Sequence, residues 1–125
     1  MTDSSYLVDS SVWIDYLLAE SKPAKDILEQ TANMFTSALT LFEVKKKMLQ
    51  KKLSQEDVQT AMAIMAKRGP LLVPTTEICN LAAELSVTHN LAAMDALIYA
   101  TAQHQKLMLV NWDNDFRKLK EVKII

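Results

Sequence analysis

Short apolar runs alternate with longer segments of helical periodicity along this chain. The runs predict buried strands at 5–9, 34–37, 71–73, 107–110 and 122–125. The segments between them repeat apolar residues at helical spacing and predict helices at 11–18, 23–30, 40–52, 54–68, 76–87 and 91–105. Strands with continuously apolar cores that alternate with helices are typical of a parallel sheet covered on both faces. We therefore expect an α/β fold with a mostly parallel central sheet of about four to five strands.

Polar residues and helix breakers support these boundaries. Ser54 begins a capping signature, and Thr75 or Thr76 caps the next helix. Gly69 ends the helix between them. The chain has 125 residues and shows no linker or internal repeat, so we expect 1–125 to form a single domain.

Composition excludes several classes of function. Hydrophobic residues make up 50% of the chain and charged residues 23%, which is ordinary for a globular protein and argues against disorder. The single glycine, Gly69, excludes the glycine-rich loops that bind nucleotide phosphates. The single cysteine, Cys79, excludes an internal disulfide and a cysteine zinc site, and we expect it to be a small core residue.

No part of the sequence predicts export or membrane insertion. Met1–Tyr6 lacks the charged and apolar regions of a signal peptide. No uninterrupted apolar run approaches the ~18 residues that a membrane span needs. Together with the single cysteine, these features predict a cytoplasmic protein that does not contact a membrane.

The overall charge is nearly balanced, at −1, whereas a domain that simply coats nucleic acid would be strongly basic. A local basic run nevertheless stands in the predicted helix at 40–52, and it consists of Lys45, Lys46, Lys47, Lys51 and Lys52. This run fits either a track for an RNA backbone or a solvated helix face. Trp13 lies in an apolar helix and is expected in the core rather than against a base.

Acidic residues follow two of the predicted strands. Asp9 ends the first strand, and Asn111, Asp113 and Asp115 follow the fourth. Ligands of open parallel sheets bind at the carboxyl ends of the strands. If these two strands are neighbours, their acids face the same crevice.

Two further acids stand within predicted helices. Asp95 is the only formal charge in the otherwise apolar segment 91–102, where an ionised carboxylate is costly unless something pairs with it. Glu43 precedes Lys47 by one helical turn, which on local evidence places it on a polar stripe.

Each acid also has a purely structural interpretation. Asp9 and Asp95 fit helix caps, and Asp113 and Asp115 fit turn residues. Glu43 fits an exposed ion pair with the lysine one turn later.

Considered together, the acids predict metal chemistry. Clustered carboxylates raise one another's pKa values by repulsion, and a divalent cation removes that penalty. An all-oxygen site suits Mg²⁺ or Mn²⁺ better than zinc. Such ions activate water and stabilise in-line displacement at phosphorus, so hydrolysis of a phosphodiester needs no side-chain nucleophile.

Four stretches of the chain, in the same order, resemble the PIN-domain ribonucleases, specifically the VapC-like toxins of type II toxin–antitoxin pairs. The matching stretches are 8–17, 36–44, 94–102 and 110–116. The first and third are specific, and four in order make coincidence improbable. The resemblance covers essentially the whole chain and implies a three-layer α/β/α fold and a metal-dependent endoribonuclease.

The resemblance also implies roles for individual residues. Asp9, Glu43 and Asp95 match the first three acids of the family, and Asp113 matches the fourth, with Asp115 close behind it. The supporting positions are Ser10 or Ser11 beside the first acid and Asn111, which stands where the family commonly has Ser or Thr. The residues expected to contact RNA are Lys46, Lys47 and Arg117.

The same resemblance implies an RNA substrate, transfer or ribosomal RNA, together with a cognate antitoxin protein and a homodimer. A non-catalytic PIN-like module that binds RNA or protein is the alternative. A receiver-like phosphoacceptor domain is disfavoured because the third strand ends without an acid, at Val73–Pro74. A haloacid-dehalogenase-type phosphatase is disfavoured because Ser11 stands where it needs a second Asp.

Overall fold

The computed structural model describes residues 5–30, 33–111, 119–120 and 122–124. A five-stranded sheet in the order β3-β2-β1-β4-β5 forms its centre, and every neighbouring pair of strands is parallel. The strands are β1 (Tyr6–Val8), β2 (Met34–Ser37), β3 (Leu71–Leu72), β4 (Met108–Asn111) and β5 (Val122–Ile124).

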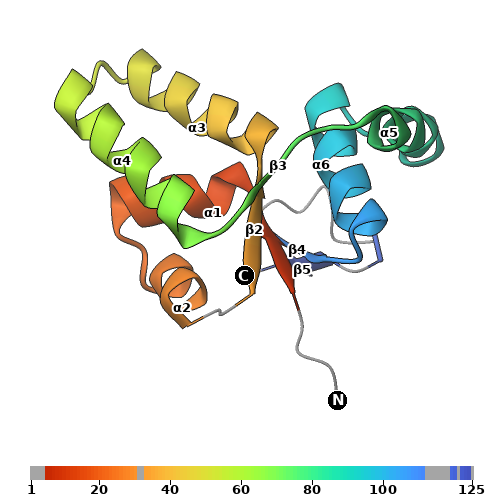
Figure 1. Cartoon of the computed structure of the whole chain (residues 1–125), viewed down its shortest axis with the longest axis horizontal. Helices are drawn as coiled ribbons and strands as arrows, with labels where there is room; N and C mark the ends of the chain where they lie inside the picture. The colour runs from red at the N-terminus through yellow and green to blue at the C-terminus, as the bar shows by residue number, and fades with distance from the viewer. Residues whose placement is uncertain (1–4, 31–32, 112–118, 121, 125) are drawn as a thin grey trace.

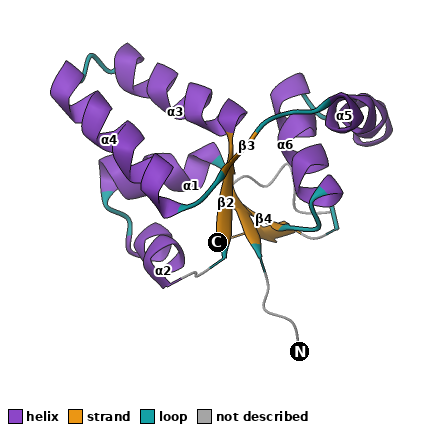
Figure 2. Ribbon diagram, in the orientation of Figure 1, coloured by secondary structure: helices purple, strands orange, loops and turns teal. Residues whose placement is uncertain are grey.

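Helices cover both faces of this sheet, which confirms the three-layer α/β/α arrangement. They are α1 (Ser10–Ile14), η1 (Asp15–Ala19), α2 (Lys22–Gln30), α3 (Ala38–Gln50), α4 (Gln55–Arg68), α5 (Thr76–His89) and α6 (Ala93–His104). Figure 1 shows α1 to α4 on one side of the strands and α5 and α6 on the other. Figure 2 shows the strands as a thin central layer between the two groups of helices.

The two faces of the sheet have separate apolar cores. Leu7 of β1 and Leu109 of β4 belong to the core beneath α5 and α6. Val8 and Val110, the next residue of each strand, belong to the core beneath α1 to α4. Successive side chains of a strand point to opposite faces, so a continuously apolar strand fills both cores. Trp13 is completely buried in the second core, as its position in an apolar helix predicts.

The predicted helix at 11–18 is divided in the structure. The α-helix α1 is followed by η1, a π-helical turn in which the Glu20 N–H donates to the carbonyl oxygen of Asp15. Tyr16, Leu17 and Leu18 of this turn all pack partly against the same core. A π-helix turns less per residue than an α-helix, which keeps three consecutive side chains nearer to one side.

Cys79 is exposed, so the expectation that it is a core residue is wrong. The inner face of α5 carries Ile78 and Ala82, which lie one helical turn apart and are buried. The next position after Ile78 is rotated by about 100° around the helix axis and therefore points outward.

Several helices end in a left-handed residue that is not glycine. Positive φ angles occur at Glu20, Lys52, Asn90 and Lys106, at 51°, 58°, 54° and 58°. Each of these residues follows the end of a helix, where one left-handed residue turns the chain away from the axis.

Gly69 has a different reason to be glycine. It ends α4 in an extended conformation, so its φ requires no particular residue. A Cβ atom at this position would overlap the carbonyl oxygen of Met34 in β2. The close approach of the two backbones therefore requires a residue without a side chain.

No helix in the described ranges is long and apolar enough to cross a membrane.

A buried hydrogen bond ties α1 to β2 and yields a prediction. The Trp13 Nε1–H donates to Thr36 Oγ1 at 3.1 Å, and both side chains are at most 1% exposed. Thr36→Val keeps the shape but leaves the indole N–H without its acceptor, which should lower the free energy of unfolding by about 1–3 kcal/mol. Urea unfolding followed by tryptophan fluorescence measures the loss.

Thr36→Ser is the matched control, because it keeps the hydroxyl and removes only a methyl group. We expect Thr36→Ser to retain more stability than Thr36→Val. An unfolding midpoint of Thr36→Val equal to that of the wild type would show that the hydrogen bond contributes nothing.

Candidate functional site

The site begins at the end of β1, where Asp9 leaves the sheet. The Asp9 N–H donates to the carbonyl oxygen of Val110 at 3.0 Å, which keeps this residue in register with β4. Its carboxylate accepts hydrogen bonds from the Ser11 N–H at 3.3 Å and from Ser11 Oγ at 3.1 Å. Asp9 is therefore the N-cap of α1, as its structural interpretation predicts. The same bonds hold a carboxylate that is only 7% exposed at the carboxyl edge of the sheet.

Strands β1 and β4 are direct neighbours, so the condition for a shared crevice is met. Asn111 ends β4 and is completely buried. Asp113, Asp115 and Arg117 follow it in the sequence but lie outside the residues that the structure describes.

Glu43 enters the site from the second turn of α3. This helix begins directly after β2, where Ser37 Oγ accepts a hydrogen bond from the Leu39 N–H at 3.1 Å. Helix α3 packs against both α1 and α6. The Ser10 side chain, at the start of α1, makes a hydrogen bond to the Glu43 carboxylate. Two helices that follow neighbouring strands are thereby connected at one polar contact.

The charges around Glu43 show which residues meet here. Burial raises the pKa of the Glu43 carboxyl group, and the negative charges of Asp9 and then Asp95 raise it further. The Ser10 hydrogen bond and the positive charge of Lys46 lower this pKa and partly offset the increase. Carboxyl groups from β1, α3 and α6 therefore lie close enough to interact as charges.

The expected exposed ion pair between Glu43 and Lys47 does not form. The ion pairs between described residues join Lys22 to Asp26 and His104 to Glu77. Glu43 is partly buried and faces other carboxylates, and the lysine that acts on its pKa is Lys46. The local spacing gave the wrong partner because it ignores the neighbouring elements.

Asp95 lies in the first turn of α6 but does not cap it. The N-cap position is Ala92, whose side chain makes no capping hydrogen bond. Asp95 therefore stands near the helix N-terminus, as its structural interpretation predicts, but not at the N-cap position itself. The partial positive charge at a helix N-terminus still favours a carboxylate in this turn, even without a direct cap.

A pocket of about 300 Å³ opens beside these groups. The residues that line it are Ser10, Ile14, Phe42, Glu43, Lys46, Lys47, Gln50 and Met94. Both lysines are exposed, so one face of the pocket is cationic while Glu43 is anionic. Sequence reasoning did not single out Phe42 or Met94 here, although Phe42 directly precedes Glu43 and Met94 directly precedes Asp95.

The donor chemistry of this region suits a hard divalent cation. The carboxylates of Asp9, Glu43 and Asp95 offer oxygen atoms only, as Mg²⁺ and Mn²⁺ prefer. The repulsion that raises the Glu43 pKa is the penalty that a cation would relieve. Among the described residues, no three His, Cys, Asp or Glu side chains are close enough together to hold a metal ion. The three carboxylates thus interact through their charges without closing around a common point.

Comparison with solved structures finds toxin–antitoxin proteins of similar fold. A toxin–antitoxin complex from Klebsiella pneumoniae is 25% identical, with a TM-score of 0.84 over 95% of this chain and 96% of that chain. VapBC2 from Rickettsia felis, bound to a promoter DNA fragment, is 17% identical, with a TM-score of 0.81 over 96% of each chain. VapC20 from Mycobacterium tuberculosis, a Sarcin-Ricin loop cleaving toxin, is 21% identical, with a TM-score of 0.79 over 96% of this chain and 98% of that chain.

A comparison with curated protein sequences finds no significant match. The family model of the PIN domain matches residues 6–122, from the first residue of β1 to the first residue of β5. The match spans strands β1 to β4 and the acids Asp9, Glu43, Asp95, Asp113 and Asp115. This chain therefore belongs to the PIN domain family.

Proposed function

We propose that this protein is an endoribonuclease that depends on Mg²⁺ or Mn²⁺ and is the toxin of a toxin–antitoxin pair. The observation that carries the proposal is the electrostatic contact of Glu43 with Asp9 and Asp95, three acids from three separate elements. A fold gains no stability from gathering like charges in a half-buried place. Such a cluster is explained by a cationic ligand, and PIN domain nucleases generally depend on divalent metal ions.

The proposed ligands are carboxylates of four residues. Asp9, Glu43 and Asp95 would hold the ion together with Asp113, and Asp115 is the alternative to Asp113. A bound cation would supply an activated water and offset the charge that develops on a phosphodiester during hydrolysis.

The surrounding residues prepare these carboxylates. The two hydrogen bonds from Ser11 orient the Asp9 carboxylate, and the Ser10 side chain orients Glu43. Asn111 supports the same edge of the sheet from the end of β4. Lys46 and Lys47 line the pocket beside Glu43, where they would attract an RNA phosphate. Arg117 is proposed to contribute to the same contact.

The proposed partners follow from the structural comparisons. The similar structure from Klebsiella pneumoniae is a toxin–antitoxin complex. DNA-bound VapBC from Salmonella typhimurium and VapBC-1 from nontypeable Haemophilus influenzae also have a similar fold. We propose a small antitoxin as the partner of this chain, a homodimer as its assembly, and transfer or ribosomal RNA as its substrate. A cytoplasmic location is the setting in which these partners would meet.

Removal of one proposed ligand tests the activity. We expect Asp95→Asn to reduce Mn²⁺-dependent cleavage of a mixed pool of transfer and ribosomal RNA by about 100-fold or more, since even partners of metal ligands contribute 10–100-fold. The measurement is gel analysis of the RNA over time, with and without a chelator. Asp57→Asn is the matched control, because Asp57 also lies in the first turn of a helix, α4, but is exposed.

Cleavage by the wild type and by Asp57→Asn, but not by Asp95→Asn, supports the proposal. Equal cleavage by all three proteins, each purified to constant specific activity by a final size-exclusion step, would overturn the assignment of Asp95. If the wild type does not bind Mn²⁺ in calorimetry and does not cleave RNA, the protein is better explained as a non-catalytic PIN-like binding module than as a nuclease.

Burial of Glu43, together with repulsion from Asp9 and Asp95, raises its pKa and so predicts a stability effect that depends on pH. The folded protein holds the Glu43 proton more tightly than the unfolded chain, whose carboxyl group has the ordinary pKa of 4.5. Folding stability therefore falls as the pH rises above that value and Glu43 ionises. Glu43→Gln escapes this loss, so without metal it should have a higher melting temperature than the wild type at pH 7. The difference should shrink toward zero near pH 4.

Differential scanning fluorimetry with a chelator measures both melting temperatures. Glu84→Gln, on the exposed face of α5, is the control and should match the wild type at every pH. Added Mn²⁺ should raise the melting temperature of the wild type more than that of Glu43→Gln. A Glu43→Gln protein that is less stable than the wild type at pH 7 would contradict the claim that the ionised Glu43 carboxylate destabilises the fold.

A further inference from the structure

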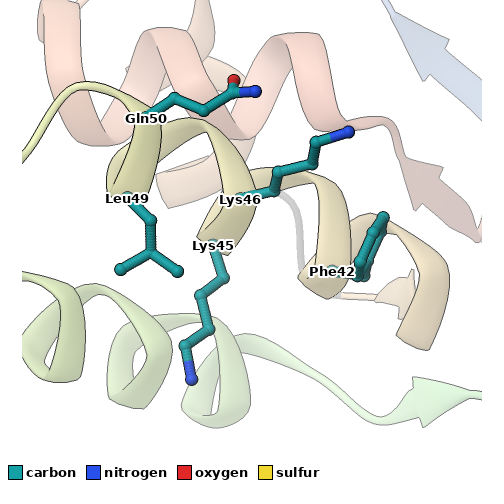
Figure 3. A pocket seen from close by; sticks show the side chains of 5 residues that line it. All are labelled: Phe42, Lys45, Lys46, Leu49 and Gln50. Carbon is teal, nitrogen blue, oxygen red and sulfur yellow. The ribbon is translucent and has the colours of Figure 1, made fainter.

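One exposed stripe of α3 is not explained by the proposed metal site. Phe42 and Leu49, two turns apart, are each 56% exposed, which is unusual for large apolar side chains on a helix that also has a buried face. Lys45, Lys46 and Gln50 lie on the same face and are also exposed. These five residues line a pocket of about 460 Å³. Figure 3 shows that all five side chains come from α3 and that the Lys46 amine extends toward Phe42.

This pocket adjoins the carboxylate site. Phe42, Lys46 and Gln50 line both the stripe pocket and the pocket that contains Glu43. The Lys46 Nζ lies 5.9 Å from the centre of the Phe42 ring, within the range of a cation–π contact. The structure thus places an exposed aromatic ring, a cation and the acidic cluster in one continuous surface.

The chemistry of this surface favours a nucleic-acid strand over a protein. Interfaces between proteins are depleted in lysine at their cores, yet the apolar residues here are interleaved with lysines. An aromatic ring with adjacent cations is what single-stranded nucleic acid requires, because the ring stacks on a base and the amines contact phosphates. Phe42 and Glu43 line the same pocket, so a base on the ring would lie beside the acidic cluster.

We propose that Phe42 is a base-stacking residue that holds a single-stranded RNA nucleotide beside the acidic cluster, with Lys45 and Lys46 contacting its phosphates. The inference rests on the proposed ribonuclease function and adds a residue that positions the substrate. The ring orders an unpaired base, so the surface selects single strands over duplexes. Stacking uses the π-face that every base has, so the contact selects for strand form and not for sequence.

Binding of RNA without cleavage tests this role directly. The protein is Asp95→Asn, full length, and the probes are fluorescein-labelled single-stranded oligo(U) and oligo(A) of about ten nucleotides. Adding Phe42→Leu, which keeps an apolar side chain but removes the ring, should weaken binding of both probes about tenfold in fluorescence anisotropy. Phe42→Tyr should retain the wild-type affinity. Leu49→Ala, equally exposed on the same stripe, should have a smaller effect than Phe42→Leu.

A series of probes with one abasic nucleotide each separates stacking from other causes. Each probe of the series lacks the base at a different position. If the ring stacks on a base, one of these probes should bind more weakly than the intact probe to the protein that retains Phe42, but not to Phe42→Leu. Equal affinity of Phe42 and Phe42→Leu overturns the proposal. A different oligomeric state of Phe42→Leu in analytical ultracentrifugation would also overturn the proposal, because it would assign the stripe to a contact between protein chains.

The outcome is distinguishable from failure of the proposed function. RNA cleavage by the wild type with unchanged binding by Phe42→Leu would leave the nuclease intact and remove only the stacking role. If binding depends on Phe42 but the wild type does not cleave RNA, the stacking role is supported and the nuclease function is rejected. Absence of binding to either probe overturns the stacking role.

Discussion

The parallel pairing of β1 with both β2 and β4 is the constraint on which the candidate site depends. Parallel strands all end at the same edge of the sheet. The residues that directly follow them therefore lie close together, however far apart they are in the sequence. Asp9 follows β1, Asn111 ends β4, and the helix that carries Glu43 follows β2. A hairpin in place of any of these crossovers would send one of the groups to the opposite edge.

The sequence was informative wherever the determinant is local. The apolar run at 34–37 coincides with β2, and Ser54 and Thr75 cap the helices that their spacing predicts. It was misleading for two acids whose surroundings are set by other elements. The partner of Glu43 and the surroundings of Asp95 are set by neighbouring elements, which no spacing along one helix records. The PIN resemblance supplied what periodicity could not, because it assigned Glu43 to the acidic group against its local pattern.

The fold holds an unfavourable electrostatic arrangement around Glu43. Glu43 is partly buried within the electrostatic reach of two other carboxylates, and among the described residues Ser10 and Lys46 lower its pKa in return. The apolar cores on the two faces of the sheet hold the elements that carry these charges, so the side chains cannot separate without moving a helix. Stability elsewhere in the molecule thus maintains a locally unfavourable arrangement of charges. The exposed Phe42 beside it is comparable, because an aromatic ring exposed to water is also unfavourable until a ligand covers it.

The four left-handed helix ends have a consequence for how far this protein can be stabilised. A residue with a Cβ in that conformation is disfavoured by about 1 kcal/mol relative to glycine, and only asparagine tolerates it well. Three of the four ends carry Glu20, Lys52 or Lys106 and so retain backbone strain, while the single glycine of the chain serves a steric contact at Gly69. Substitution of these three exposed residues by glycine or asparagine would therefore raise the thermal stability of the protein. Such substitutions could be combined with variants of the candidate site that are too unstable to be produced as folded protein.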